Sequence, residues 1–198
     1  MRAMGNTVGS QLREIVIGTL LGDSFLEQNG NHKRFVCGHS LKQEQYILWI
    51  YKVLSDLIEC KLYYRKWKDL RNDHTYTSVL LRSVTSPVWD EFYDMFYKDH
   101  RRIIPINLPD IISPQVLAVW IMDDGYRRND CNAMRLNTQA YDQLQHQIIR
   151  QSLMKLGINS KVHHQANQLV TYIPSSSMEV LRKQVRPYIV KSMEYKIA

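Results

Sequence analysis

Two aspartates, Asp23 and Asp124, end two apolar segments that resemble each other. Residues 15–25 read IVIGTLLGDSF and residues 116–126 read VLAVWIMDDGY. In each segment an apolar run ends in an acidic residue and then a small one. Carboxylates are hard oxygen ligands that suit Mg²⁺, which leaves its remaining positions to water and phosphate. Two such groups brought together predict metal-assisted hydrolysis of a phosphodiester bond.

A single aspartate before a small residue is more often a plain helix terminator than a ligand. The repetition of Asp23 at the equivalent position Asp124 favours the functional interpretation. Gly18 and Gly22 lie one helical turn apart, so they clear one face of the first segment for close approach of another backbone. We therefore expect two buried apolar helices, packed side by side, with their carboxylate-bearing ends together.

The two segments begin an approximate internal repeat. After each segment, apolar periodicity predicts a strand, an amphipathic helix, two more strands and a closing helix. In the first half these elements cover residues 33–38, 41–57, 61–68, 75–82 and 88–97. In the second half they cover residues 133–139, 141–156, 160–164, 169–173 and 178–185. The fold class is therefore α+β, with one unit used twice.

Short residue patterns predict where these elements begin and how they are connected. Serine followed by proline, at residues 86–87 and 113–114, predicts helix starts. The pairs Asn72-Asp73 and Ala166-Asn167 predict turns between strands. The proline-rich segment 104–109 is expected to connect the halves without forming a helix.

Composition points to a globular protein with a polyanionic partner. Lysine plus arginine number 26 against 19 aspartates and glutamates, and the pI is near 9.3. No run of eighteen apolar residues is present, which excludes a membrane span, and the first residues lack the apolar core of a secretory signal. The three cysteines are odd in number and widely spaced, which fits a reducing compartment and argues against disulfides or a cysteine zinc site.

Several predicted strands carry residues that suit nucleic acid on one face. Alternation groups Arg135 with Asn137 and Gln139, and Lys161 with His163 and Gln165. Arginine suits guanine edges, and asparagine and glutamine suit adenine edges. In the first half, one face carries Lys61, Tyr63, Arg65 and Trp67, and the other carries Lys66 and Lys68. Arg127 and Arg128 follow Asp124 closely enough to contact phosphate. The alternative is that these are ordinary solvated surfaces.

The segments IGTLLGDSF and LAVWIMDDGY resemble the two signature motifs of the LAGLIDADG homing endonucleases. The resemblance covers nearly the whole chain and is strongest to single-chain, intron-encoded members that carry both motifs. Further matching stretches are HSLKQEQY, RRIIPINLP, LNTQ and RPYIVKSMEYKI.

The resemblance implies an α+β fold of two pseudo-twofold-related αββαββα repeats, over residues 7–109 and 110–198. Their four-stranded antiparallel sheets would form a saddle on double-stranded DNA. The implied activity is Mg²⁺-dependent cleavage of both strands that leaves short 3′ overhangs, with Mn²⁺ able to substitute for Mg²⁺. The chain would act as a monomer.

The resemblance also implies roles for individual residues. Asp23 and Asp124 would be metal ligands, and the backbone carbonyls of Gly22 and Asp123 would help to coordinate the metal. Lys196, in MEYK, and Arg102, in RRIIP, would be the basic residues beside the metals.

The sequence departs from the family pattern at two of its motif positions. Ser24 stands where glycine is usual, and serine is also small. Arg102 stands where lysine is usual, and because arginine keeps its proton it is interpreted as a stabilising charge. Ser40 and Gln165 align only approximately with polar neighbours of the family's active site.

The leading hypothesis is a site-specific double-strand DNA endonuclease that promotes mobility of its host intron. One alternative is a maturase, in which the same fold holds intron RNA; another is a DNA-binding descendant that no longer cleaves. Retention of both Asp23 and Asp124 favours the nuclease, because a pure binder could lose two mutually repulsive carboxylates. The protein is expected inside a cell, in an organelle (mitochondrion or chloroplast) or a bacterial cytoplasm.

Overall fold

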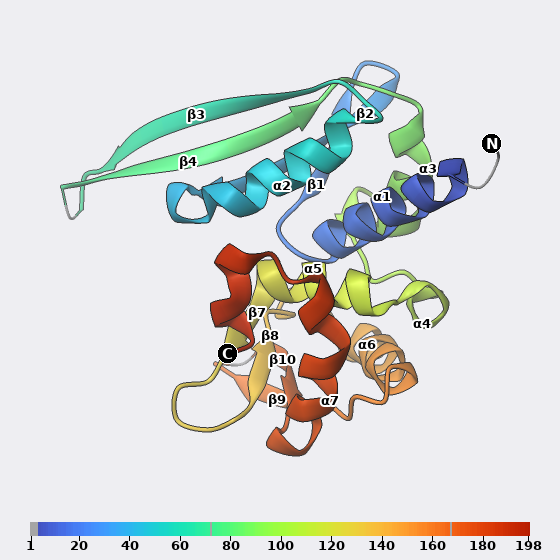
Figure 1. Ribbon diagram of the computed structural model, residues 1–198, viewed down its shortest axis with the longest axis vertical. Helices are drawn as coiled ribbons and strands as arrows, with labels where there is room; N and C mark the ends of the chain where they lie inside the picture. Colours follow the sequence, from blue (N-terminus) through green and yellow to red (C-terminus); the bar gives the residue numbers. More distant parts are fainter. Residues whose placement is uncertain (1–3, 72, 167) are drawn as a thin grey trace. The chain divides into compact units, whose positions relative to one another are not determined.

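A computed structural model (Figure 1) describes residues 4–71, 73–166 and 168–198. Its contacts divide the chain into two compact units. The first unit holds the described residues up to Arg13 together with Asp23–Asp94, and the second holds Glu14–Gly22 and Met95–Ala198. Helix α1 (Met4–Leu21) contributes its first part to the first unit and its last part to the second. The predicted repeat boundary between residues 109 and 110 stays a prediction.

The first unit is built on a four-stranded antiparallel sheet in the order β1-β2-β4-β3. Its strands are β1 (Phe25–Asn29), β2 (His32–Ser40), β3 (Cys60–Asp69) and β4 (His74–Ser83). A 3₁₀ turn, η1 (Leu41–Gln43), leads into helix α2 (Glu44–Ser55), and helix α3 (Val88–Phe96) follows the sheet. Figure 1 shows α2 lying along the β3–β4 hairpin. Phe35 of β2 stacks on Trp89 of α3, with ring centroids 5.4 Å apart, so α3 packs on this sheet. Helix α2 also buries one side, with Tyr46, Ile47, Ile50 and Leu54.

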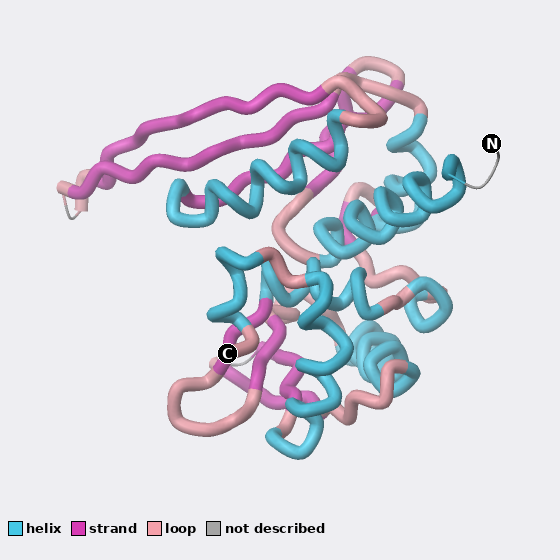
Figure 2. The backbone as a smooth tube through the Cα atoms, in the orientation of Figure 1, coloured by secondary structure: helices cyan, strands magenta, loops and turns pink. Residues whose placement is uncertain are grey.

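The second unit repeats this plan. Helix α5 (Pro114–Asp124) precedes an antiparallel sheet in the order β7-β8-β10-β9. The strands are β7 (Gly125–Arg127), β8 (Met134–Leu136), β9 (Lys161–Gln165) and β10 (Gln168–Ile173). Helix α6 (Gln143–Lys155) connects β8 to β9, and helix α7 (Ser175–Val185) follows β10. Figure 2 shows the strands of each unit in magenta and the helices that accompany them in cyan.

Smaller elements complete the second unit. Two short strands, β5 (Tyr97–Lys98) and β6 (Arg101–Arg102), form a hairpin, and α4 (Leu108–Ile111) is one helical turn. The 3₁₀ helices η2 (Arg186–Tyr188) and η3 (Lys191–Lys196) end the chain. Within the described ranges, no helix combines the length and the apolar character that a membrane span requires.

The α+β prediction is confirmed, because both halves run αββαββα and both sheets have the same strand order. The residue patterns missed β1 and β7, which are short edge strands with little apolar alternation. The strand predicted at 133–139 was too long, because regular pairing ends at Leu136. The segment 104–109 is free of helix at residues 104–107, as predicted, but the prediction was wrong at its end. Helix α4 begins at Leu108, and its Pro109 lies in the first turn, where no amide donor is needed.

Both predicted helix starts are confirmed. Ser113 caps α5, because its hydroxyl accepts a hydrogen bond from the amide of Val116, and Pro114 occupies the first turn. Ser86 accepts a bond from the amide of Val88, where α3 begins. Of the predicted turns, Asn72 and Asn167 lie outside the described residues.

The last part of α1 and helix α5 pack closely within the second unit. A Cβ added to Gly18 would lie 2.6 Å from the Cβ of Val119 and 2.8 Å from the carbonyl oxygen of Val116. A Cβ added to Gly22 would overlap the side chain of Asp123. Every residue of α5 from Gln115 to Asp123 is buried. The two glycines therefore permit the helix contact that the sequence predicted, with the ends of the two helices meeting at Gly22 and Asp123.

This contact predicts opposite effects of alanine at two glycines of α1. Gly18→Ala should lower the free energy of unfolding by about 1–3 kcal/mol, because its methyl group overpacks the helix contact. Gly9→Ala is the matched control: a Cβ there meets nothing within 4 Å. It should raise stability by about 0.5–1 kcal/mol through helix propensity. Urea unfolding measures both, and equal stabilisation by the two variants would contradict the close packing.

Candidate functional site

Asp124 is the last residue of α5, and the structure fixes both its side chain and its backbone. Its Oδ2 accepts a hydrogen bond from the indole of Trp120, one turn earlier, at 3.3 Å. Its carbonyl accepts from the amide of Asn137, at 3.1 Å, just after β8. One carboxylate oxygen is thus oriented by a fully buried ring. A carboxylate held in this way is better ordered for binding a cation than one on a free surface.

The two basic residues that the resemblance assigned to the site occupy equivalent positions in the two halves. Arg102 of β6 donates from Nη1 to the carbonyl of Gly22 at 2.8 Å. Lys196 of η3 donates from Nζ to the carbonyl of Asp123 at 3.1 Å. Gly22 directly precedes Asp23, and Asp123 directly precedes Asp124. In both halves a basic side chain therefore donates a hydrogen bond to the carbonyl just before the final aspartate of the motif.

Lys196 makes a second contact of the same kind, to the carbonyl of Gly125 at 2.9 Å. Its ammonium group bridges the two carbonyls that flank Asp124. Lys196 also helps to line a cleft with Gly125, Tyr126, Arg127, Asn129 and Tyr195. The positively charged Lys196 in the lining of this cleft favours binding of a negatively charged group such as phosphate.

Tyr141 adds a neutral hydrogen-bonding group near Arg102 and Asp124. Burial raises the pKa of its phenol to about 12; the charge of Arg102 opposes this rise, and that of Asp124 adds to it. The phenol is therefore protonated at physiological pH.

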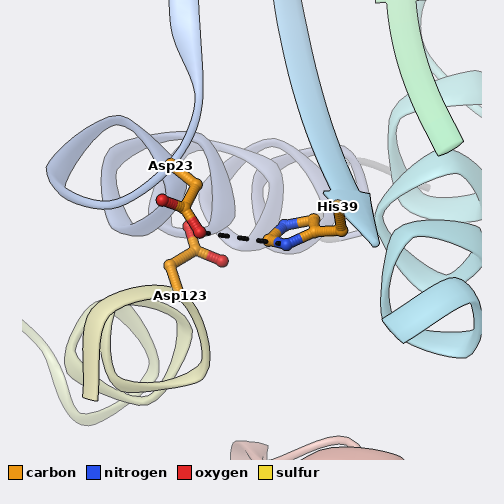
Figure 3. A group of neighbouring side chains, drawn as sticks. All are labelled: Asp23, His39 and Asp123. Atoms are coloured by element: carbon orange, nitrogen blue, oxygen red, sulfur yellow. Dashed lines mark ion pairs between the residues drawn. The ribbon is translucent and has the colours of Figure 1, made fainter. Parts of the chain in front are cut away.

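Asp23 lies in the first unit, in the turn after α1, and its side chain is 49% exposed. Its Oδ2 lies 3.9 Å from Nδ1 of His39, whose side chain is only 2% exposed. Figure 3 shows these two side chains, with a dashed line marking the pair. The carboxylate is open to solvent on one side and faces a buried imidazole on the other.

In the second unit the predicted DNA-contacting residues of β8 and β9 share one face of the sheet. Strand register places Tyr126, Arg135, Tyr172 and Lys161 in one row across β7, β8, β10 and β9. His163 stacks on Tyr172, with ring centroids 4.2 Å apart. Burial lowers the pKa of His163, and the charges of Arg135, Lys161 and Arg128 lower it further. This face therefore gathers several cations around a neutral imidazole.

The remaining predicted contacts of this unit are Gln165, Asn137, Gln139, Arg127 and Arg128. Arg135 donates to the side-chain oxygen of Gln165 at 3.3 Å, so these two residues lie together. Asn137 and Gln139 follow the end of β8 and lie in a loop instead of a strand. Arg127 is exposed at the end of β7, and Arg128 is paired with Asp130.

In the first unit the β3–β4 hairpin presents one open face. Lys61, Tyr63, Arg65 and Trp67 share it, as predicted; their partners on β4 are Arg82, Leu80, Ser78 and Tyr76. Arg82 lies over the ring of Tyr63, 5.7 Å from its centroid. Trp67 stacks on Tyr76 at 4.7 Å. The face thus combines exposed aromatic rings with cations.

Lys66 and Lys68 lie on the opposite face of the hairpin, the one that bears the core. Near the base of the hairpin this face is covered by α2, where Tyr64 donates to Glu44 at 2.7 Å. Lys68 pairs with Asp73 at the tip, at 2.6 Å. These two lysines are therefore separate from the group that contains Lys61 and Arg65.

The residue patterns missed four polar side chains at these sites. They are His39 beside Asp23, Trp120 on Asp124, and Arg34 and Arg82 on the open face of the first sheet. Alternation along β2 and β4 could have identified the two arginines. Trp120 lies in the apolar run 116–122, where the sequence gives no sign that its indole donates to Asp124. Nothing in the sequence pairs His39 with Asp23, because that contact depends on how β2 folds back.

Comparisons with known proteins agree with this architecture. The model of the LAGLIDADG DNA endonuclease family matches residues 13–181. Probable intron-encoded endonuclease 1 of Wickerhamomyces canadensis is 27% identical, over 96% of this chain and 85% of that protein. Cytochrome b mRNA maturase bI2 of Debaryomyces hansenii is 26% identical, over 94% of this chain and 73% of that protein.

Among solved structures, the homing endonuclease I-WcaI bound to its DNA recognition sequence is similar in fold. The TM-score is 0.84 at 24% identity, and the match covers 96% of this chain and 86% of that one. The N-terminal LAGLIDADG domain of DUF199/WhiA matches more distantly, with a TM-score of 0.56 at 13% identity, over 96% of this chain and 87% of that one.

Proposed function

Because the chain belongs to the LAGLIDADG DNA endonuclease family, we propose that it is a site-specific double-strand DNA endonuclease. It hydrolyses one phosphodiester bond in each strand, leaves short 3′ overhangs and promotes mobility of its host intron. One observation carries the proposal. In each half an aspartate ends the motif helix or follows it within two residues, and a basic side chain donates to the carbonyl that precedes this aspartate.

The donor set fits Mg²⁺. The carboxylates of Asp23 and Asp124 and the carbonyls of Gly22 and Asp123 are all oxygen donors, which this ion prefers. Trp120 holds one oxygen of Asp124, so its carboxylate needs little reorganisation. When bound, Mg²⁺ or Mn²⁺ would supply an activated water and neutralise charge on the leaving oxygen.

The protein's own groups complete this chemistry. Lys196 and Arg102 hold the backbone next to the aspartates and place positive charge where the phosphate gains negative charge. Arg102 keeps its proton, so it stabilises charge and does not act as a base. Asp23 and Asp124 would each supply a carboxylate ligand to a metal ion, and the positive charges of Arg102 and Lys196 offset the negative charge of these carboxylates.

Recognition of DNA is assigned to the open faces of the two sheets. A β-ribbon fits the major groove, where base edges present distinct donors and acceptors. Arg135, Gln165 and the neighbouring His163 suit base contacts, and Lys61 and Arg65 suit phosphate or base contacts. The formal net charge of +7 adds general attraction to a polyanion.

Arg135 is expected to contribute to recognition of the DNA base sequence. Its side chain lies in the centre of the polar row, between Tyr126 and Tyr172. Arg135→Ala should relax specificity at one or two base pairs, at a cost of about 1–3 kcal/mol there. Binding to a panel of single-base variants measures this. Arg186, exposed in η2, provides the control Arg186→Ala. Uniform weakening across the panel would show instead that Arg135 touches phosphate only.

A second candidate function is assistance to RNA splicing. It is favoured by the similarity to a protein named as a cytochrome b mRNA maturase, which is as strong as the similarity to the named endonuclease. In this alternative the same basic faces would hold intron RNA.

The nuclease and the maturase are distinguished by incubating the purified chain and Mg²⁺ with each of two substrates in turn. One is DNA that spans the intron's empty insertion site, or a randomised-target library where the host intron is unknown. The other is the unspliced intron RNA. Cut DNA with 3′ overhangs supports the nuclease. Faster splicing without DNA cleavage supports the maturase and rejects the nuclease.

A further inference from the structure

His39 is a buried histidine at a position where the sheet otherwise carries apolar side chains. On β2 it follows Phe35 and Cys37 along the inward face, and its partner on β4 is Val79. All three of these neighbours are fully buried. An imidazole in such a place loses its hydration, so it needs a polar role to offset that cost.

The ring of His39 is held in a fixed orientation. It packs edge-on against Tyr46 of α2, with centroids 5.1 Å apart and planes at 62°. Tyr46 is itself fully buried. This packing directs Nδ1 of His39 toward the partly exposed carboxylate of Asp23 (Figure 3).

The distance between these two groups is too long for a direct hydrogen bond and short enough for both to contact one ion. Nδ1 and Oδ2 are 3.9 Å apart, beyond the range of a hydrogen bond. Two ligand atoms that each lie about 2.1 Å from one ion are at most about 4.2 Å apart. The observed separation therefore leaves room for a cation that both atoms contact.

We propose that His39 is a nitrogen ligand of the divalent ion held by Asp23, a role that rests on the metal site of the proposed function. Imidazole favours transition ions over Mg²⁺ and Ca²⁺. His39 thus makes the Asp23 site selective for Mn²⁺ over Mg²⁺.

The position equivalent to His39 in the second half is a threonine, so the two halves differ there. His39 lies five residues before the start of α2 at Glu44, and Thr138 lies five residues before the start of α6 at Gln143. The hydroxyl of Thr138 instead bonds to His146 at 3.0 Å and to Thr171 at 3.1 Å, in a buried network. The position equivalent to His39 therefore offers no imidazole to Asp124, and we assign the selectivity for Mn²⁺ to the Asp23 site.

The test uses the full chain, Mn²⁺ as the probe and pulsed electron paramagnetic resonance as the readout, so it does not require cleavage. Wild-type protein should show modulation from a directly bound nitrogen, and labelling histidine with ¹⁵N should change its frequency. His39→Gln and His39→Thr should lose this signal and bind Mn²⁺ at least about tenfold more weakly. Their affinity for Mg²⁺ should change less than threefold. His74→Gln, in the exposed part of β4, is the matched control and should keep the signal.

The results separate this inference from the proposed function. Mn²⁺ that binds in an Asp23-dependent way but shows no histidine nitrogen, labelled or not, overturns the role of His39 and leaves the nuclease proposal standing. Mn²⁺ binding that does not change in Asp23→Asn overturns both the role of His39 and the metal site. The isotope experiment needs no variant, so misfolding of a His39 substitution does not affect it.

Discussion

Asp23→Asn and Asp124→Asn are each expected to reduce double-strand cleavage at least about a thousandfold while DNA affinity is kept. A metal ligand that stabilises transition-state charge contributes several kcal/mol, and about 4 kcal/mol corresponds to three powers of ten in rate. The amide keeps the size of the carboxylate but not its charge. Single-turnover cleavage at saturating protein measures the rate, and equilibrium binding in Ca²⁺ measures the affinity.

Affinity should be unchanged or slightly higher in both variants, because each removes a negative charge from the region where phosphate lies. Asp23 is about half exposed, so asparagine leaves no buried polar group without solvent there. Asp110→Asn is the control; Asp110 is exposed and paired with Lys155 at 2.5 Å. That variant should cleave at the wild-type rate.

The result also separates catalysis from structure. If both aspartate variants lost DNA binding or unfolded at lower urea, the carboxylates would be helix-end residues needed for folding. If one variant nicked a single strand efficiently, the two aspartates would serve different strands. That outcome would agree with one active centre for each half of the chain.

Features that depend on local pattern were predictable from the sequence. The end of α1 just before Asp23, the end of α5 at Asp124, the serine cap of α5 and the alternation of Arg135 with buried neighbours all follow from residues close in the chain. The internal repeat in the sequence further predicted that the two halves have the same sequence of elements. The motif resemblance supplied the four-stranded sheets that periodicity alone did not predict.

Features that depend on long-range register were not predictable in the same way. Strand β1 consists largely of polar residues and is a strand because β2 pairs with it. Arg102 reaches the carbonyl of Gly22 across 80 positions of sequence. The orientation of His39 requires both the β2–β4 register and the packing of Tyr46. Each of these contacts becomes visible only when distant segments are placed together.

Lys196→Ala is expected to slow single-turnover cleavage about a hundredfold, as loss of one preorganised donor does at other active sites. DNA affinity should fall far less, because one phosphate contact among many is a small share of binding. Lys191 begins the same 3₁₀ helix and is exposed, so Lys191→Ala is the matched control. That control should leave the cleavage rate unchanged, and an unchanged rate in Lys196→Ala as well would reject its role.

Two further substitutions at Lys196 separate charge from positioning. The ammonium group bonds to the carbonyls of Asp123 and Gly125, at 3.1 and 2.9 Å, so it could act by holding the backbone on either side of Asp124. Glutamine can donate hydrogen bonds to such carbonyls but carries no charge, whereas arginine carries the charge with a different shape. If charge at the phosphate is the main effect, Lys196→Arg should recover more of the rate than Lys196→Gln. If glutamine recovers the rate fully, Lys196 is a positioning residue for Asp124, and the charge beside the phosphate must come from elsewhere.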